Sequence, residues 1–218
     1  RHDIPITVLN TLRRRLSALK GGRLAAHLQG RDARALVLSD VPGDDPRVVG
    51  SGLVVASASE GVLPKDLPAS LDVLFLQREL PPAATLPVEM VGCLEDAIDA
   101  IEDRARALGL RVLRWPQRIE GAAASVGAAV ADALLQAEAD LLLAGGETTV
   151  RLPEHPGTGG RCQHLALSAA LRMDGVPKVW LLVAGTDGVD GASTDAGALV
   201  DGATAARARL LEIGRAHV

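Results

Sequence analysis

Aromatic side chains are nearly absent from this sequence, which has one phenylalanine, two tryptophans and no tyrosine in 218 residues. Proteins that bind single-stranded nucleic acid stack bases on aromatic rings, and their binding grooves are basic. Because the net charge is also −4, the sequence predicts no nucleic-acid partner. The same scarcity predicts a core of alanine, valine and leucine, built from small helices packed on sheets.

Cysteines and long apolar runs are scarce as well. The two cysteines, Cys93 and Cys162, lie far apart without a CxxC pair, so neither a disulfide framework nor a zinc site is indicated. This pattern favours a reducing, cytoplasmic setting. No apolar run reaches the roughly 18 residues that a membrane span needs, so we expect no membrane partner.

Several familiar catalytic motifs are missing from the sequence. There is no GxxxxGK[ST] word for a P-loop, no GxGxxG word for a dinucleotide site and no GxSxG word for a serine nucleophile. The spacing of Asp187, Asp190 and Asp195 does not match an EF-hand calcium loop, and the five histidines have no metal-ligand spacing. Any site must therefore be built from less specific loops.

Helical and strand-like segments alternate along the chain, which predicts an α/β fold with a largely parallel sheet. We expect Thr7 to cap the first helix, Gly109 to end another, and Asp195 to cap a short segment that reaches Val200. Helices are predicted at 8–20, from 23, from 45, and at 94–108, 120–137 and 163–173. Strands are predicted at 35–39, 110–113, 139–144 and 178–184.

Prolines gather between residues 64 and 90, where the sequence changes character. We place a domain boundary there, with a first domain over 1–87 and a second over 88–218. Ligand sites often lie at domain interfaces. We therefore expect two α/β lobes that meet near residues 81–90, with the loops after three predicted strands opening toward one cleft.

Three predicted strands end in polar, glycine-rich loops at 39–45, 145–149 and 185–191. In open α/β sheets ligands bind beyond the carboxyl ends of strands, where glycines let N–H groups approach an anion and carboxylates can hold a divalent metal. For one loop alone, turn glycines and solvated aspartates are the better interpretation. Three such loops in one chain favour a binding site.

Two further loops combine glycines with a cation. Residues 157–161 precede a predicted helix, whose N-terminal N–H groups and Arg161 could bind a phosphate or carboxylate, although a surface turn is an equal alternative. Residues 20–23 have the same two interpretations, and Lys20 is one of only three lysines in the chain.

Five ordered words stand out along the chain: LNTLRRRLSALKGGRLA at 9–25, SDVPGDDPRVVGSG at 39–52, AGGETTVRL at 144–152, GGRCQHLALSAAL at 159–171 and AGTDGVDGASTDAGALVD at 184–201. With these words the chain resembles the glycerate 2-kinase family, whose C-terminal part is the MOFRL domain and whose members are often called hydroxypyruvate reductases. The resemblance implies the C-terminal part of a Rossmann-like three-layer domain followed by a MOFRL-type α/β domain. The implied reaction transfers the γ-phosphoryl group of ATP to the 2-hydroxyl of D-glycerate, with magnesium.

Phosphoryl transfer needs positioning and charge neutralisation, which suits glycine loops, cations and carboxylates. On the resemblance, the catalytic residues are Lys20, Arg161 and Asp187. The residues expected to bind substrate or phosphate are Gly21, Gly22, Ser39, Gly43, Gly145, Gly146, Thr148, Gly160, Gly185, Thr186 and Gly188. The residues expected to hold the metal are Asp40, Asp44, Asp45, Glu147 and Asp190.

The sequence also departs from the family pattern. Cys162 and His164 replace the amide and carboxylate of the usual GGRNQE word, and SGLVVAS stands where SGPTVPD is commoner. An N-terminal Gly-Lys-Ala word and a C-terminal Gly-Thr-Asn-Val word are missing, so we expect a chain truncated at both ends that turns over D-glycerate slowly. The alternatives are an NAD(P)H-dependent hydroxypyruvate reductase and a non-catalytic remnant that binds an anion.

Overall fold

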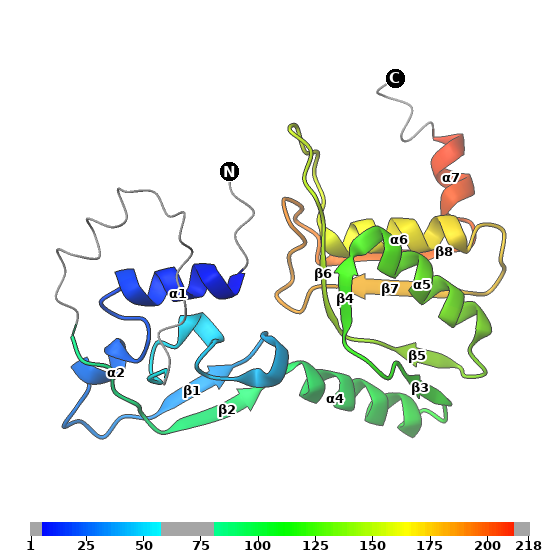
Figure 1. Ribbon diagram of the computed structural model, residues 1–218. Helices are drawn as coiled ribbons and strands as arrows, with labels where there is room; N and C mark the ends of the chain where they lie inside the picture. Colours follow the sequence, from blue (N-terminus) through cyan, green and yellow to red (C-terminus); the bar gives the residue numbers. More distant parts are fainter. Residues whose placement is uncertain (1–5, 58–80, 212–218) are drawn as a thin grey trace. The chain divides into compact units, whose positions relative to one another are not determined.

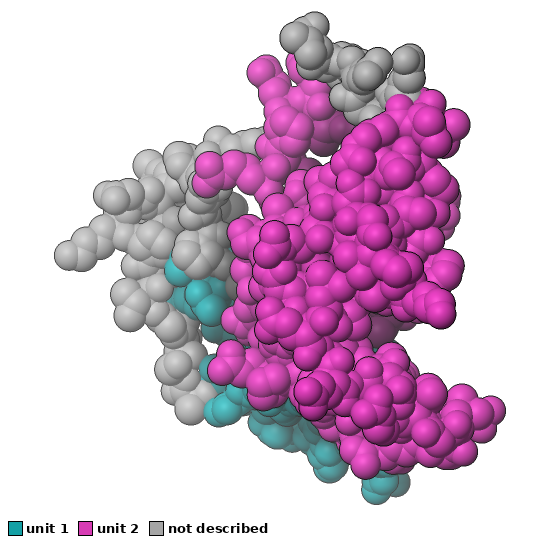
Figure 2. Space-filling model, turned by 90° about the vertical axis from the view of Figure 1, so that its right-hand side faces the viewer, with its two compact units in different colours: residues 1–97 teal, residues 98–218 magenta. Residues whose placement is uncertain are grey.

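The computed structural model describes residues 6–57 and 81–211 (Figure 1). The chain divides into two compact units, 1–97 and 98–218, shown in different colours in Figure 2. Both units mix helices with strands, and three of the strand pairs are parallel, which confirms the predicted α/β class. The Rossmann-like character, the domain boundary after residue 87 and the common cleft stay predictions.

Unit 1 is built around one pair of parallel strands, in which Ala35 lies opposite Val88 and Val37 opposite Met90. A register shift follows Val37, and the two strands run side by side in Figure 1. The first strand confirms the one predicted at 35–39, and the second was not predicted. The elements are α1 (Ile6–Leu16), α2 (Arg23–His27), β1 (Ala35–Leu38), η1 (Pro42–Asp44), η2 (Val49–Ser51) and β2 (Val88–Gly92).

The first helix is shorter than the sequence predicts. Thr7 does not cap it, because α1 begins at Ile6 and the Thr7 carbonyl already accepts a hydrogen bond from the Thr11 hydroxyl. At the other end, the Ser17 Oγ accepts the N–H groups of Leu19 and Lys20 at 3.2 Å each. Serine side chains that bind nearby backbone in this way compete with helical hydrogen bonds, so α1 stops at Leu16.

Helix α4 (Leu94–Ala107) matches its prediction closely. The Asp96 carboxylate accepts the Cys93 N–H at its start, at 2.8 Å. At its end Gly109 adopts a φ of 79°, and the Leu110 N–H donates to the Ala105 carbonyl, as expected for a glycine C-cap. The predicted apolar face is only partly buried, because Leu108, which follows the helix, is 61% exposed.

The described residues of unit 2, up to 211, form three strand pairs. β3 (Val112–Arg114) and β5 (Leu141–Leu143) are parallel, and so are β4 (Ile119–Ala122) and β6 (Gly146–Thr149). β7 (Trp180–Ala184) and β8 (Gly197–Asp201) are antiparallel. The remaining elements are α5 (Ala123–Gln136), α6 (Arg161–Arg172) and α7 (Thr204–Leu210). None of the helices in the described part of the chain is both long and apolar enough to cross a membrane.

Two helix predictions in unit 2 are wrong. The segment that follows Asp195 is not helical, because β8 pairs along its whole length with β7 and buries Val200 against α6. The helix predicted at 120–137 begins only at Ala123, since residues 119–122 form β4. In both places the local sequence pattern is typical of a helix. The residues form a strand because they pair with another strand of unit 2.

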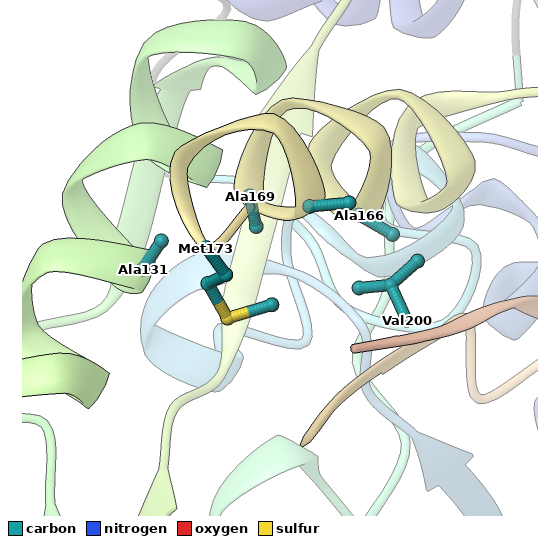
Figure 3. Close-up of a cluster of buried hydrophobic side chains, with 6 residues drawn as sticks. Ala131, Ala166, Ala169, Met173 and Val200 are labelled. Atoms are coloured by element: carbon teal, nitrogen blue, oxygen red, sulfur yellow. The ribbon is translucent and has the colours of Figure 1, made fainter. Parts of the chain in front are cut away.

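Small side chains form the core of unit 2, as the composition predicts. Helices α5 and α6 pack side by side, and α6 covers one face of β7 and β8 (Figures 1 and 3). Met173 just after α6 is fully buried beside Val200, and alanines let the two helices approach closely. The buried cluster comprises Ala131, Ala166, Ala169, Ala170, Met173 and Val200.

Met173 is the largest fully buried side chain among the described residues, so its truncation should be costly. We expect Met173→Ala to lower the free energy of unfolding by about 2–5 kcal/mol, because it removes apolar contacts and leaves a cavity. The matched control is Leu167→Ala on the same helix, where the side chain is 53% exposed. Urea denaturation of both variants tests this, and equal stabilities would contradict the packing described.

The Asp201 carboxylate at the end of β8 accepts hydrogen bonds from Thr204 and Arg207 of helix α7. Hydrogen bonds from Arg207 and then Thr204 lower the pKa of Asp201 from 3.8 to about 2. We expect Arg207→Ala to raise this pKa toward 3.8, with Arg209→Ala, which pairs with Asp174, as the control. Because the folded pKa is depressed, the stabilisation is present above pH 3.8 and is lost as the pH falls through about 2. A carboxyl NMR titration that shows the same Asp201 pKa in both variants would refute it.

Candidate functional site

Three glycine-rich segments of unit 2 meet at the N-terminus of α6. Glu147 of β6 forms an ion pair with Arg161, the first residue of the helix. The Asp190 carboxylate, from the loop after β7, accepts the Cys162 and Gln163 N–H groups at 3.0 and 2.7 Å. The Ala192 N–H donates to the Gly159 carbonyl at 3.1 Å. The segments that the sequence analysis identified at 145–149, 157–161 and 185–191 therefore form one contiguous surface within this unit.

The N–H groups at the start of α6 already have an anionic partner. Gly160 precedes the helix and has no side chain to cap it, so Asp190, only 3% exposed, takes that place. A Cβ on Gly160 would clash with the Asp190 carboxylate, and one on Gly191 would clash with the Gly159 carbonyl. Glycine at both positions lets the two loops touch. An external anion at this surface would thus bind the Arg161 side chain rather than these two N–H groups.

Arg161 and Glu147 lie at the surface, where their side chains are 50% and 54% exposed. An ion pair in that setting is worth about 0–1 kcal/mol. A phosphate group is a better partner for the guanidinium, because it offers bidentate, charge-assisted hydrogen bonds. Arg161 can therefore exchange Glu147 for a phosphate at small cost.

The segment 145–149 is not the loop that the sequence predicts. Residues 146–149 form β6, which pairs in register with β4, and the Gly145 carbonyl accepts the Ile119 N–H at 2.8 Å. Gly146 lies so close to the Ile119 backbone that a Cβ would not fit. Thr148 is buried, and Glu147 is exposed. These glycines therefore serve strand pairing, and Glu147 is the residue that reaches the surface beside Arg161.

The loop after β7 presents Thr186, Asp187 and Gly188, all exposed. Its base is held by the Gly185 N–H, which donates to the Ala196 carbonyl at 2.7 Å. The Gly188 N–H closes the turn on the Gly185 carbonyl at 3.1 Å, and Asp187 accepts the Val189 N–H at 3.3 Å. The loop is thus ordered from within, with the Asp187 carboxylate toward solvent.

In unit 1, the glycine word after α1 packs against residues 50–52. The Gly21 and Gly22 N–H groups donate to the carbonyls of Ser51 and Gly52 at 3.2 and 2.6 Å. Their role in this arrangement is internal, which leaves Lys20 as the residue of this loop able to face an anion. The Lys20 Nζ donates one hydrogen bond to the Gly50 carbonyl at 2.7 Å and lies at the surface.

The loop after β1 contains the remaining predicted site residues. Asp45 binds Arg47, whose hydrogen bonds lower the pKa of the Asp45 carboxyl. Ser39 is buried, and neither its Oγ nor the Asp44 Oδ1 has a hydrogen-bond partner in the described part of the chain. Asp40 is exposed, and Gly43 has open space around it. Buried polar atoms normally find a partner, so the Ser39 hydroxyl is the group here that best fits a ligand contact.

A metal cage made of protein groups alone is not present in residues 6–57 and 81–211. No three histidine, cysteine, aspartate or glutamate side chains in these ranges are grouped to hold an ion. Of the residues expected to hold a metal, Asp45 pairs with Arg47, Glu147 pairs with Arg161 and Asp190 accepts N–H groups of α6; their metal roles stay predictions. Asp40 and Asp187 are exposed.

The sequence did not identify the residues that connect α6 to the loop between β7 and β8. The Gln163 amide donates to the Ser193 Oγ at 3.0 Å, and the Ser193 hydroxyl donates to Asp195 at 3.2 Å. Both bridging residues lie inside the matched words, but no local pattern distinguishes a bridge from a solvated side chain. At the unusual Cys162, burial and then Asp190 raise the pKa of the thiol, which is the opposite of activation.

Comparison with known proteins gives these loops a context. The family model described as a domain of unknown function, DUF4147, matches residues 1–84, and the MOFRL family model matches residues 140–217. Relatives include a "Putative hydroxypyruvate reductase" of Agrobacterium vitis, 36% identical over 94% of this chain and 58% of its own length. A D-glycerate 2-kinase of Thermotoga maritima is 33% identical over 92% of this chain and 52% of its own.

A solved structure has the same fold. The crystal structure of glycerate kinase from Thermotoga maritima matches with a TM-score of 0.76 and 30% identity, over 96% of this chain and 54% of that one. The chain therefore spans about half the length of the relatives it matches. The resemblance seen in the five sequence words is confirmed: a DUF4147 region is followed by a MOFRL region, and most of the chain is similar to proteins named glycerate 2-kinase.

Proposed function

We propose that the chain takes part in the ATP-dependent phosphorylation of D-glycerate at its 2-hydroxyl. The observation that carries the proposal is the surface at the N-terminus of α6, where exposed Arg161 lies beside the ordered loop that presents Asp187. A fixed cation and an exposed carboxylate on glycine-bounded loops are what phosphoryl transfer requires of a protein. The names of the Thermotoga maritima relatives point to the same reaction.

In the proposed reaction the 2-hydroxyl oxygen of D-glycerate attacks the γ-phosphorus of ATP. The bond from that phosphorus to the bridging oxygen breaks, ADP leaves with the electron pair, and the hydroxyl proton is released. Arg161 neutralises phosphate charge after leaving Glu147. The roles of Lys20 and Ser39, which belong to unit 1, stay predictions.

Asp187 is the proposed contact for the magnesium ion, which reduces the charge repulsion between the phosphates and the attacking oxygen. It is exposed, and it lies in the same loop as Asp190, which accepts the N–H of Cys162, the residue after Arg161. Asp190 is excluded from that role in this proposal because both of its oxygens are engaged by the α6 backbone. An ATP-dependent reaction also suits the cytoplasmic setting that the cysteine content predicts.

The second candidate is reduction of hydroxypyruvate by NAD(P)H, which the name of the Agrobacterium vitis relative suggests. That reaction needs a site for a dinucleotide, and the sequence has no GxGxxG word after a strand. The exposed Arg161 and Asp187 suit phosphoryl transfer better than hydride transfer.

Three assays on the purified chain separate the candidates. ADP release that depends on D-glycerate supports the kinase, and NADH oxidation that depends on hydroxypyruvate supports the reductase. A shift in melting temperature with MgATP or phosphate, without either turnover, supports a binding remnant. We expect the first result, and the second or third alone would overturn the proposal.

A further inference from the structure

We infer that Asp190 is a positioning residue, which holds Arg161 and Asp187 in register by fastening the loop after β7 to the first turn of α6. The inference rests on the proposed function and adds a residue whose role is neither metal binding nor proton transfer. Its carboxylate contacts α6 one residue beyond Arg161, and Asp187 precedes it by one short turn. One buried side chain thus links the proposed cation to the proposed carboxylate.

The contacts of Asp190 explain why it can act this way. It is 3% exposed, and its two oxygens separately accept the Cys162 and Gln163 N–H groups, which leaves little freedom for the side chain. Its own N–H donates to the Asp195 carbonyl at 2.8 Å, so its backbone is held as well. A carboxylate at a helix N-terminus is also stabilised by the helix dipole.

The segment before α6 makes such an anchor necessary. Residues 157–160 contain three glycines and a threonine, a composition with high conformational freedom that does not fix where a helix starts. The Gly159 carbonyl accepts the Ala192 N–H, and Gln163 bonds to Ser193, so further contacts with the loop after β7 surround the same helix start. Without Asp190, two N–H groups in the first turn of α6 would lose their hydrogen-bond acceptor. The backbone position of Arg161 would then no longer be held.

Amide hydrogen exchange of the 218-residue chain tests the anchor itself. In Asp190→Asn only one side-chain oxygen can still accept an N–H, so we expect at least one of the Cys162 and Gln163 amides to exchange about tenfold faster or more. Asp195→Asn, which removes a charge from the same segment without touching those N–H groups, should leave them unchanged. Unchanged protection in Asp190→Asn would overturn the inference. Urea denaturation of each variant shows whether any change is local or global.

A double-mutant cycle tests whether Asp190 acts through Arg161. The readout is the Kd for MgATP by calorimetry in the parent, Asp190→Asn, Arg161→Ala and the double variant. We expect Asp190→Asn to weaken binding about tenfold in the parent and less than about twofold in the Arg161→Ala background, because a positioning effect needs the residue that is positioned.

The possible outcomes separate the inference from the function on which it rests. Equal fold-changes in both backgrounds would show that Asp190 acts on stability alone, and would overturn the positioning role. If Arg161→Ala leaves MgATP binding unchanged, the proposed phosphate contact of Arg161 is wrong, and the positioning role falls with it. In that case hydrogen exchange still shows whether Asp190 anchors the helix.

Discussion

Replacing Arg161 by alanine should lower the rate of phosphoryl transfer from ATP to D-glycerate about a hundredfold or more, the usual cost of removing one preorganised charge from a transferring group. The increase in the activation free energy should exceed any decrease in the free energy of unfolding. In the free protein Arg161 makes an exposed ion pair with Glu147, and such a pair contributes about 0–1 kcal/mol. Coupled ADP release gives kcat, and thermal melting gives the stability.

Two further variants sharpen the Arg161 test. Arg161→Lys keeps the charge and loses the planar fork, so it should recover only part of the activity. Arg172→Ala removes another exposed arginine from the far end of α6, where it pairs with Asp132, and should leave kcat unchanged. Equal activity of Arg161→Ala and Arg172→Ala would exclude Arg161 from the site.

Replacing Asp187 by asparagine should reduce kcat by a similar or larger factor, about a hundredfold to a thousandfold. The change is nearly isosteric and keeps an oxygen that can accept the Val189 N–H, so the turn should survive. If Asp187 holds magnesium, activity should rise again as the magnesium concentration is increased. A role in accepting the hydroxyl proton would give no such recovery.

The control for Asp187 is Asp174→Asn, which removes an aspartate that pairs with Arg209 of α7 and has no role in the proposed site. Its kcat and its magnesium dependence should match those of the parent. Full activity in Asp187→Asn at every magnesium concentration would show that the ordered loop after β7 serves the fold and not the reaction.

The sequence predicts the elements whose signals are local. The apolar runs at β1 and β7 identify these strands, and Gly109 marks the end of α4, because burial and capping depend on residues close in the chain. Strands β6 and β8 were missed for the opposite reason. The glycine–glutamate–threonine sequence of β6 resembles a loop, and the segment after Asp195, which contains β8, resembles a short helix that an aspartate caps. Only pairing with β4 and β7 makes these segments strands.

The sequence predicted which loops contribute to the candidate site, but not the role of each residue in them. The matched words identify the segments that meet at α6. They do not show that the buried Asp190 carboxylate accepts two N–H groups of α6. Nor do they show that the Gly21 and Gly22 N–H groups donate to the carbonyls of residues 51 and 52. A carboxylate that caps a helix and one that binds a metal look the same in a sequence, because the partner comes from a distant part of the chain.

The most direct test of the central proposal is to identify the product formed from D-glycerate and MgATP by phosphorus NMR. The account predicts ADP together with glycerate phosphorylated on its 2-hydroxyl, in equal amounts, and loss of both in Arg161→Ala and Asp187→Asn. Intact ATP and unmodified D-glycerate after prolonged incubation of the folded parent chain would contradict it, as would a phosphorylated product that forms equally well in the two variants.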